Sequence, residues 1–230
     1  MSKRNTELIK KENILSENKD IDIKEDHFKE LMDIYTSAMD KMTMYLNEIK
    51  RDVKKFYDYD VIDHISSRLK SPESIITKME KKGYDLNYKE LIENIHDVAG
   101  VRVICPLKDD IYKMREIISN IDEIKILEET DYISKPKKSG YRSYHMVCSV
   151  PVEYKENILY VNCEVQIRTM AMDFWATLEH RMKYKSSVGY SEECSKEFIK
   201  FAKTVASLDN KIGKLYKKRH GNNDIVVLKK

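Results

Sequence analysis

Two acidic residues stand in or beside stretches that are otherwise apolar. Asp97 comes directly before the run VAGVRVIC, and Glu164 lies inside the run YVNCEVQIRT. A carboxylate in such a setting is costly unless it is paired, protonated or bound to a cation. Two carboxylates on neighbouring strands could hold Mg²⁺, which prefers carboxylates together with substrate phosphates. The alternative is that each pairs with a nearby arginine such as Arg102 or Arg168, and spacing alone slightly favours that alternative.

A second segment, HISSRLKSPESIITKMEKK, is rich in cations. Arg68 and Lys70 precede a predicted helix, and Lys78 lies on that helix one to two turns in. Cations beside a helix N-terminus suit a polyphosphate, because free backbone N–H groups and the helix dipole add to the side-chain charge. The segment is not a Walker loop, since it has no Gly-rich stretch ending in GK[ST]. Taken alone, such a segment is more often a solvated charged face.

A third segment, DYISKPKKSGYRSYH, contains Pro and Gly and is therefore predicted to be a loop. Its cations surround Tyr141, and they are Lys135, Lys137, Lys138 and Arg142. An aromatic ring flanked by cations suits the stacking of a base whose phosphates the cations hold. A surface turn with a packed tyrosine is the ordinary alternative. His145 is either a core histidine or a phosphate ligand.

These segments must be positioned by helices and strands. One apolar stripe with steps of three and four predicts a first helix, and its members are Phe28, Leu31, Tyr35, Met39, Met42, Leu46, Ile49, Val53 and Phe56. This stripe indicates either packing on the core or self-association. Ser71 and Pro72 predict the start of a second helix, which Gly83 should end.

The remaining pattern alternates between helices and strands. We expect helices over 88–96, 111–121, 170–182 and 191–218, and strands over 98–107, 124–133, 143–151 and 158–168. The segments 1–25 and 221–230 contain too few apolar residues to pack and are expected to be a flexible tail and a loose end. One domain over 26–220 is therefore predicted.

Composition limits the range of functions. The 42 basic and 39 acidic residues leave a net charge of only +3, which does not demand a nucleic-acid partner. No run approaches the roughly 20 apolar residues that cross a bilayer, and the first residues lack the core of a signal peptide, so a cytoplasmic protein is expected. The four cysteines show no metal-site spacing, which favours reduced thiols over a zinc site.

Five short segments together resemble RelA/SpoT-type synthetase domains in order and approximate spacing. They are HISSRLKSPESI, DVAGVRV, SGYRSYH, EVQIRT and MDFWATLEH, and the match runs from about His64 to Lys185. The chain thus looks like a stand-alone small alarmone synthetase. The resemblance implies an α/β (α+β) fold similar to nucleotidyltransferases, with a mixed central sheet flanked by helices and with N- and C-terminal helices. It also implies transfer of pyrophosphate from ATP to the 3′-hydroxyl of GDP or GTP, with Mg²⁺ as cofactor and AMP as leaving group.

The resemblance assigns roles to individual residues. Asp97 and Glu164 match the metal-binding and catalytic acids, and Glu164 would also help to activate the attacking hydroxyl. The residues matched to ATP binding are Arg68, Lys70, Lys78 and Arg102. Those assigned to the GDP or GTP side are Lys137, Tyr141, Arg142, His145, Gln166, Arg168 and Asp173.

Two positions depart from the family pattern. Position 173 is Asp where related small synthetases often have Asn, although an Asp can still accept hydrogen bonds from the guanine edge. Thr130 stands where some relatives carry an arginine, so one contact to the ATP phosphates is absent or is supplied by Lys137.

Two other function classes compete with this interpretation. A non-catalytic module that binds single-stranded RNA would also use basic loops with an interleaved tyrosine, but its phosphate backbone would be repelled by Asp97 and Glu164. Another nucleotidyltransferase would use similar acids, yet would not explain SGYRSYH. Finally, the stripe of residues 35–56 together with the last helix predicts a homo-oligomer, which we interpret as a tetramer.

Overall fold

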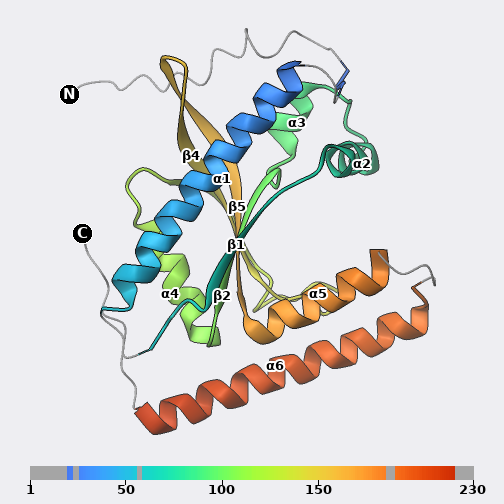
Figure 1. The fold of residues 1–230 in the computed structure, drawn as a ribbon. Helices are drawn as coiled ribbons and strands as arrows, with labels where there is room; N and C mark the ends of the chain where they lie inside the picture. Colours follow the sequence, from blue (N-terminus) through green and yellow to red (C-terminus); the bar gives the residue numbers. More distant parts are fainter. Residues whose placement is uncertain (1–19, 23–25, 56–58, 185–189, 221–230) are drawn as a thin grey trace.

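The computed structural model describes residues 20–22, 26–55, 59–184 and 190–220. In this part of the chain, helices surround one five-stranded sheet (Figure 1). The helices are α1 (Asp26–Val53), α2 (Pro72–Lys82), α3 (Tyr88–Asn94), α4 (Lys108–Ser119), α5 (Met170–Tyr184) and α6 (Glu192–His220). The strands are β1 (His64–Leu69), β2 (Ala99–Cys105), β3 (Lys125–Asp131), β4 (Tyr144–Tyr154) and β5 (Asn157–Thr169).

The sheet is mixed, which confirms the predicted fold class. Its strand order is β1-β2-β5-β4-β3, and β2 pairs with β5 in parallel while the other pairs are antiparallel. β1 is not predicted from the sequence, because HISSRL shows no clear alternation of apolar and polar residues. As an edge strand that pairs only with β2, β1 needs no such alternation.

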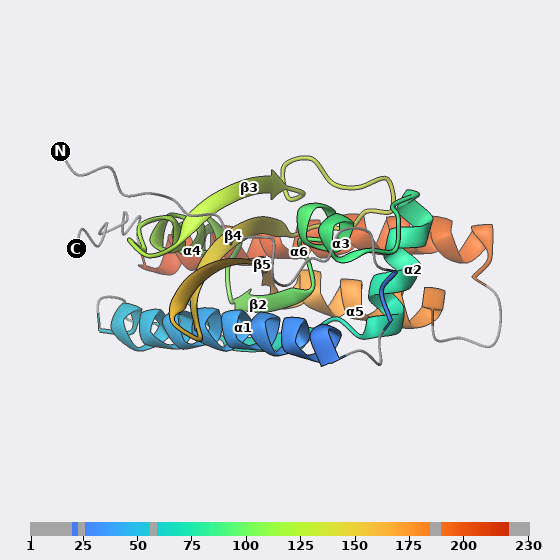
Figure 2. The same cartoon turned by 90° about the horizontal axis from the view of Figure 1, so that it is seen from above.

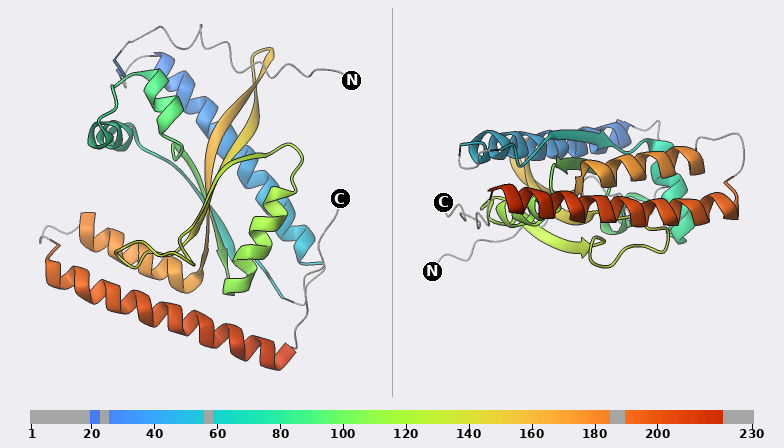
Figure 3. Two further views of the ribbon diagram at one scale, coloured as in Figure 1. Left: turned by 180° about the vertical axis from the view of Figure 1, so that it is seen from behind. Right: turned by 90° about the horizontal axis from the view of Figure 1, so that it is seen from below.

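Helices lie on both sides of the sheet. α1 and α4 cover the side that is on the left in Figure 1, whereas α2 and α5 lie on the right, and α6 runs along α5 (Figure 2). The views in Figure 3 show the same arrangement from behind and from below, with α5 and α6 forming a separate layer.

The apolar stripe of α1 packs against the protein's own core, which is the first of the two interpretations given above. Its buried members include Phe28, Leu31, Tyr35, Met42 and Leu46, and the helix contacts β1, β2, β4 and β5. Burying each large apolar side chain contributes about 1.5–3 kcal/mol. The stripe is therefore not available for self-association, and the predicted contribution of residues 35–56 to an oligomer contact is wrong. Phe56 lies outside the described residues.

The local signals at α2 are confirmed. The Ser71 hydroxyl accepts a hydrogen bond from the Ser74 N–H, Pro72 occupies the first turn, and Gly83 ends the helix in the left-handed conformation with φ 72°. Residues 20–22, in the segment expected to be a tail, differ from expectation because the apolar side chain of Ile21 is buried and its N–H donates to Leu86. The rest of that segment and residues 221–230 lie outside the described residues.

The cysteines are free, as expected. Cys105, Cys148 and Cys163 are buried in strands, and Cys194 is partly exposed. Burial raises the pKa of the Cys148 thiol to about 12 and also raises that of Cys105, so these thiols stay protonated. Within the described residues, no helix has the length and apolar composition that a bilayer span requires.

A buried carboxyl fastens α6 to the start of α5. The Thr169 hydroxyl donates to Asp209 Oδ2 at 2.8 Å and accepts from the Met172 N–H at 3.1 Å, so it caps α5 while α6 holds it. Asp209 is only 6% exposed, and its burial raises the pKa of its carboxyl. α6 is thus fixed at the point where β5 turns into α5.

We predict that Asp209→Ala lowers the free energy of unfolding by about 1–3 kcal/mol, because the Thr169 hydroxyl loses a buried acceptor. Asp209→Asn keeps an acceptor oxygen and should cost less. The pKa of Asp209 is higher in the folded protein than in the unfolded chain, so this carboxyl makes stability fall as pH rises above about 4. The deficit of the Asn variant should therefore shrink with rising pH. Urea unfolding at several pH values measures both effects; equal costs for Ala and Asn would show that the bond to Thr169 does not stabilise the fold.

Candidate active site

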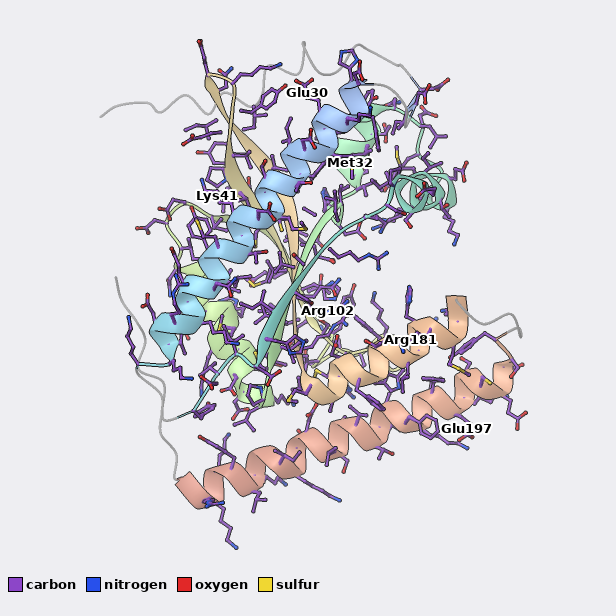
Figure 4. All side chains as sticks on the ribbon, in the orientation of Figure 1. Glu30, Met32, Lys41, Arg102, Arg181 and Glu197 are labelled. Carbon is purple, nitrogen blue, oxygen red and sulfur yellow. The ribbon has the colours of Figure 1, made fainter. Side chains whose placement is uncertain are left out.

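A polar cleft opens on the side of the sheet that faces α2 and α5. Its volume is about 740 Å³, and its walls come from β1, α2, β2, β5 and α5. The predicted site residues among its lining are Arg68, Lys70, Lys78, Asp97, Arg102, Glu164 and Gln166. Figure 4 shows Arg102 extending from β2 on this side of the sheet. The cleft thus brings together the donor-side cations and both candidate catalytic acids.

Strand register explains why residues distant in sequence meet here. Gly100 of β2 lies opposite Glu164 of β5, and Arg102 lies opposite Gln166. Alternate residues of a strand point to the same face, and neighbouring strands keep paired residues on one face. Polar side chains of β2 and β5 therefore share the cleft face, while Val101 and Val165 enter the core.

Asp97 is held by two lysines and not by an arginine. Lys70 Nζ donates to Asp97 Oδ2 at 2.7 Å, and Lys78 Nζ lies 2.7 Å from Asp97 Oδ1. Burial opposes ionisation of the Asp97 carboxyl, but the two lysines outweigh it, so its pKa lies below the ordinary value. Asp97 is therefore an ionised carboxylate at neutral pH.

Glu164 has a histidine and a glutamine as hydrogen-bonding partners instead of an arginine. His145 Nδ1 lies 3.0 Å from Glu164 Oε1, and Gln166 Nε2 donates to Glu164 Oε2 at 2.5 Å. Burial raises the pKa of Glu164, but the interactions with His145 and the hydrogen bond from Gln166 together outweigh it, so the net pKa is lowered. The charge of Asp97 raises this pKa slightly, which places the two carboxylates within electrostatic range. The arginine-pairing alternative is therefore wrong for both acids.

The two carboxylates fit a Mg²⁺ ion by their chemistry. Both are ionised, both line the same cleft, and they repel each other in the absence of a cation. The described residues contain no group of three or more His, Cys, Asp or Glu side chains placed for a metal. Mg²⁺ is commonly bound by only one or two carboxylates, with water and substrate phosphates as its other ligands. Asp97 and Glu164 match that kind of site.

The loop between β3 and β4 is fixed at both ends. Asp131 Oδ1 accepts the N–H groups of Ile133 and Ser134, at 2.8 and 3.0 Å. Gly140 has φ 93°, and a Cβ at this position would lie only 2.5 Å from the Cβ of Ala202 on α6. This close approach requires glycine, and it means that α6 holds the loop against the site.

The end of this loop is joined to Glu164 by a closed ring of hydrogen bonds. Arg168 NH2 donates to Tyr141 Oη and to Gln166 Oε1, both at 2.6 Å. Tyr141 Oη lies 2.8 Å from His145 Nε2. With a neutral His145 protonated on Nδ1, the tyrosine donates to the imidazole and the imidazole donates to Glu164, so every member has a partner. The ring preorganises the candidate acceptor side.

Two predicted cations on this loop have different surroundings. Lys137 Nζ lies 4.4 Å from the ring centre of Tyr132 and 4.9 Å from that of Tyr141, and partial burial lowers its pKa. Arg142 instead donates to the carbonyl of Ile133 at 2.6 Å, and this bond supports the loop backbone. Of the residues assigned to the GDP or GTP side, only Gln166 is among those that line the cleft.

Several residues of the cleft were missed by sequence reasoning. They are Ser66, Ser67, Glu73, Ser74, Thr77 and Lys81, and His180 of α5 also lines the cleft. Ser74, Lys78 and Lys81 share one helical face, which is separate from the face of the buried Ile75 and Met79, and this spacing is a signal that could have been used. Ser66 and Ser67 could not be found, because their strand was not predicted.

A mixed sheet with a cationic cleft and two ionised acids is suited to the class of proteins that bind phosphorylated ligands. Comparisons narrow this class. A family model described as "Region found in RelA / SpoT proteins" matches residues 67–189. The GTP pyrophosphokinase YwaC of Bacillus subtilis is 37% identical over 190 residues, which cover 83% of this chain and 90% of that relative.

A second relative and a solved structure agree with this result. The GTP pyrophosphokinase YjbM of Bacillus subtilis is 32% identical, with 79% of this chain and 84% of the relative covered. The crystal structure of small alarmone synthetase 1 from Bacillus subtilis bound to its product pppGpp matches with a TM-score of 0.79 at 29% identity, covering 85% of this chain and 100% of that chain. This chain belongs to the RelA/SpoT family.

The Tyr141 ring and its hydroxyl should have separable effects. We expect Tyr141→Ala to raise the KM for the guanine nucleotide roughly tenfold or more, because a base-stacking ring contributes about 1–3 kcal/mol, with little change for ATP. Tyr141→Phe keeps the ring, so the KM should stay close to wild type. Loss of the hydrogen bonds to Arg168 and His145 should lower kcat by about tenfold. Steady-state kinetics decide, and an equal loss for both substrates would place the guanine site elsewhere.

Proposed function

We propose that this chain is a GTP pyrophosphokinase that makes ppGpp or pppGpp in the bacterial stringent response. Transfer of pyrophosphate from ATP to the 3′-hydroxyl of GDP or GTP leaves AMP. The observation that carries the proposal is one cleft in which ionised Asp97 and Glu164 lie among donor-side cations. The proposal is also supported by two relatives named GTP pyrophosphokinase, because this chain covers most of the length of each.

The reaction forms one bond and breaks another at the β-phosphorus of ATP. The 3′-oxygen bonds to that phosphorus, the bond from phosphorus to the α,β-bridging oxygen breaks, and AMP leaves with the electron pair. The 3′-hydroxyl proton passes to Glu164, which is ionised and held by His145 and Gln166. Phosphoryl-type transfer depends mainly on in-line placement and charge neutralisation, and the cations that line the cleft would contribute to the second.

On the donor side, Lys70 and Lys78 are assigned to the ATP phosphates, and Arg68 and Arg102 to the adenine. All four line the cleft. Asp97 and Glu164 would hold Mg²⁺, which supplies charge neutralisation at the phosphates. On the acceptor side, the Tyr141 ring is assigned to guanine, with Lys137 beside it. Single-stranded RNA is not required by this function.

We also propose that the protein is a homo-oligomer, a tetramer in our interpretation, and that α6 forms a contact between copies. The heptad-spaced side chains Phe201, Leu208 and Leu215 are exposed, as is Ile212. Glutamates lie in the first turn of α6, whereas Lys214, Lys218 and Arg219 lie near its end. Antiparallel pairing of two α6 helices would set these opposite charges side by side. The cytoplasm, where thiols stay reduced, is the proposed location.

The proposed activity is tested by incubating purified protein with labelled ATP, Mg²⁺ and each nucleoside diphosphate or triphosphate. Chromatography should show AMP and a guanine nucleotide with a 3′-diphosphate. Tight retention of single-stranded RNA without any such product would instead favour the RNA-binding alternative.

Glu164→Gln removes a charge with little change in volume, so it should keep the fold and lose synthesis by on the order of 10²–10⁴-fold. Asp97→Asn should behave in the same way. Glu153→Gln, at an exposed position far along β4, is the matched control and should retain activity. Product formation per enzyme and thermal unfolding are measured for each variant. Normal turnover by either variant would contradict the catalytic role assigned to the residue that was replaced.

The oligomer proposal predicts a mass of several times the 27.2 kDa chain by light scattering at micromolar concentration. Leu208→Glu with Leu215→Glu should lower this mass, because the charges would meet across the α6 contact. Leu127→Glu changes an exposed leucine on edge strand β3 and should leave the mass unchanged. A monomeric wild-type protein, or an α6 variant of unchanged mass, contradicts the proposal.

A further inference from the structure

One carboxylate oxygen on α5 joins two arginines from different strands. Asp173 Oδ1 lies 3.0 Å from Arg168 NH1 and 3.2 Å from Arg102 NH1. Arg168 is almost fully buried, whereas the side chain of Arg102 is 36% exposed toward the cleft. Among the described residues, Asp173 is the one carboxylate that pairs with Arg102.

The two arginines belong to opposite halves of the site. Arg102 lines the cleft together with Arg68, on the side assigned to ATP. Arg168 is part of the hydrogen-bonded ring that holds Tyr141 and Gln166. Asp173 is therefore a physical link between the donor half and the acceptor half.

The link is needed because the two guanidinium groups repel each other. Burial lowers the pKa of Arg102, and the charge of Arg168 lowers it further, whereas Asp173 acts in the opposite direction. Arg168 is fixed by four hydrogen-bonding partners, which include Ser143. Without the Asp173 carboxylate, Arg102 is the group free to turn away toward solvent.

We propose that Asp173 is a positioning residue for the donor nucleotide: it holds the Arg102 guanidinium in place and couples it to the acceptor half through Arg168. This inference rests on the proposed function. It goes beyond a contact to the guanine edge, because it gives Asp173 an effect on ATP that exists before any guanine nucleotide binds. The ion pair is made through NH1, which lies at the rim of the planar guanidinium group.

The direction of the change in ATP affinity distinguishes a positioning role of Asp173 from a simple effect of its negative charge. ATP is a polyanion, so removing a nearby negative charge by itself should tighten ATP binding or leave it unchanged. Loss of a positioned Arg102 should weaken it. Glu73→Gln removes another carboxylate that lines the same cleft and so measures the charge effect alone.

The experiment is calorimetric titration with a non-hydrolysable ATP analogue and Mg²⁺, in the absence of guanine nucleotide. Asp173→Asn should weaken binding by about two- to fivefold, in line with the upper range of partly exposed ion pairs. In an Arg102→Ala background, Asp173→Asn should cause no further loss, since the effect acts through Arg102. In turnover, the KM for ATP should rise more than kcat falls.

Several results would overturn the inference. They are unchanged or tighter analogue binding by Asp173→Asn, and an additive loss in the Arg102→Ala background. A loss confined to GDP titrations would make Asp173 an acceptor contact only. If the Asn variant does not fold, Asp173→Ser removes the same charge and gives the same test. Failure of the wild-type protein to bind the ATP analogue would overturn the proposed function as well. This outcome differs from a failure of the inference alone, in which the wild-type protein binds the analogue and Asp173→Asn has no weakening effect.

Discussion

The parallel pairing of β2 with β5 is the constraint on which the site depends. Its register sets Gly100 beside Glu164 and Arg102 beside Gln166, so polar side chains collect on one face of an otherwise apolar pair of strands. Ionised groups at such positions are stable only with close partners. Lys70 and Lys78 supply them for Asp97, and His145 and Gln166 supply them for Glu164. The chemistry of the cleft and the stability of the sheet therefore rest on the same contacts.

The helices have different roles on the two faces of the sheet. The stripe of α1 fills the opposite face, where Phe28, Met42 and Leu46 are almost fully buried. That packing makes the strands a rigid platform. On the cleft side, α2 and α5 pack less closely and present polar residues, and α6 supports α5 through Asp209 and the β3–β4 loop through Ala202. A helix distant from the catalytic acids thus helps to set the geometry of the acceptor half.

Local signals predicted much of the fold. Ser71, Pro72 and Gly83 fixed the bounds of α2, since capping depends on a few adjacent residues. Motif order also selected the candidate acids and donor-side cations, and the structure places these residues in one cleft. The partners of each acid could not be predicted: they depend on strand register, and β1 was missed because an edge strand needs no apolar alternation. Whether the α1 stripe packs on the core or on another copy of the chain was likewise not predictable, because the periodicity of one helix does not reveal its tertiary packing.

The two halves of the site differ in how far they are organised without substrate. On the acceptor side, Tyr141, His145, Glu164, Gln166 and Arg168 satisfy one another in a closed ring. On the proposed donor side, Lys70 and Lys78 are bound to Asp97, so the phosphates of ATP would compete with that carboxylate for the same ammonium groups. A cation at Asp97 would remove this competition, because it would replace the lysines as the partner of the carboxylate and release them toward the phosphates. Metal and ATP binding would then favour each other without any movement of the sheet, and the preformed acceptor half would remain unchanged.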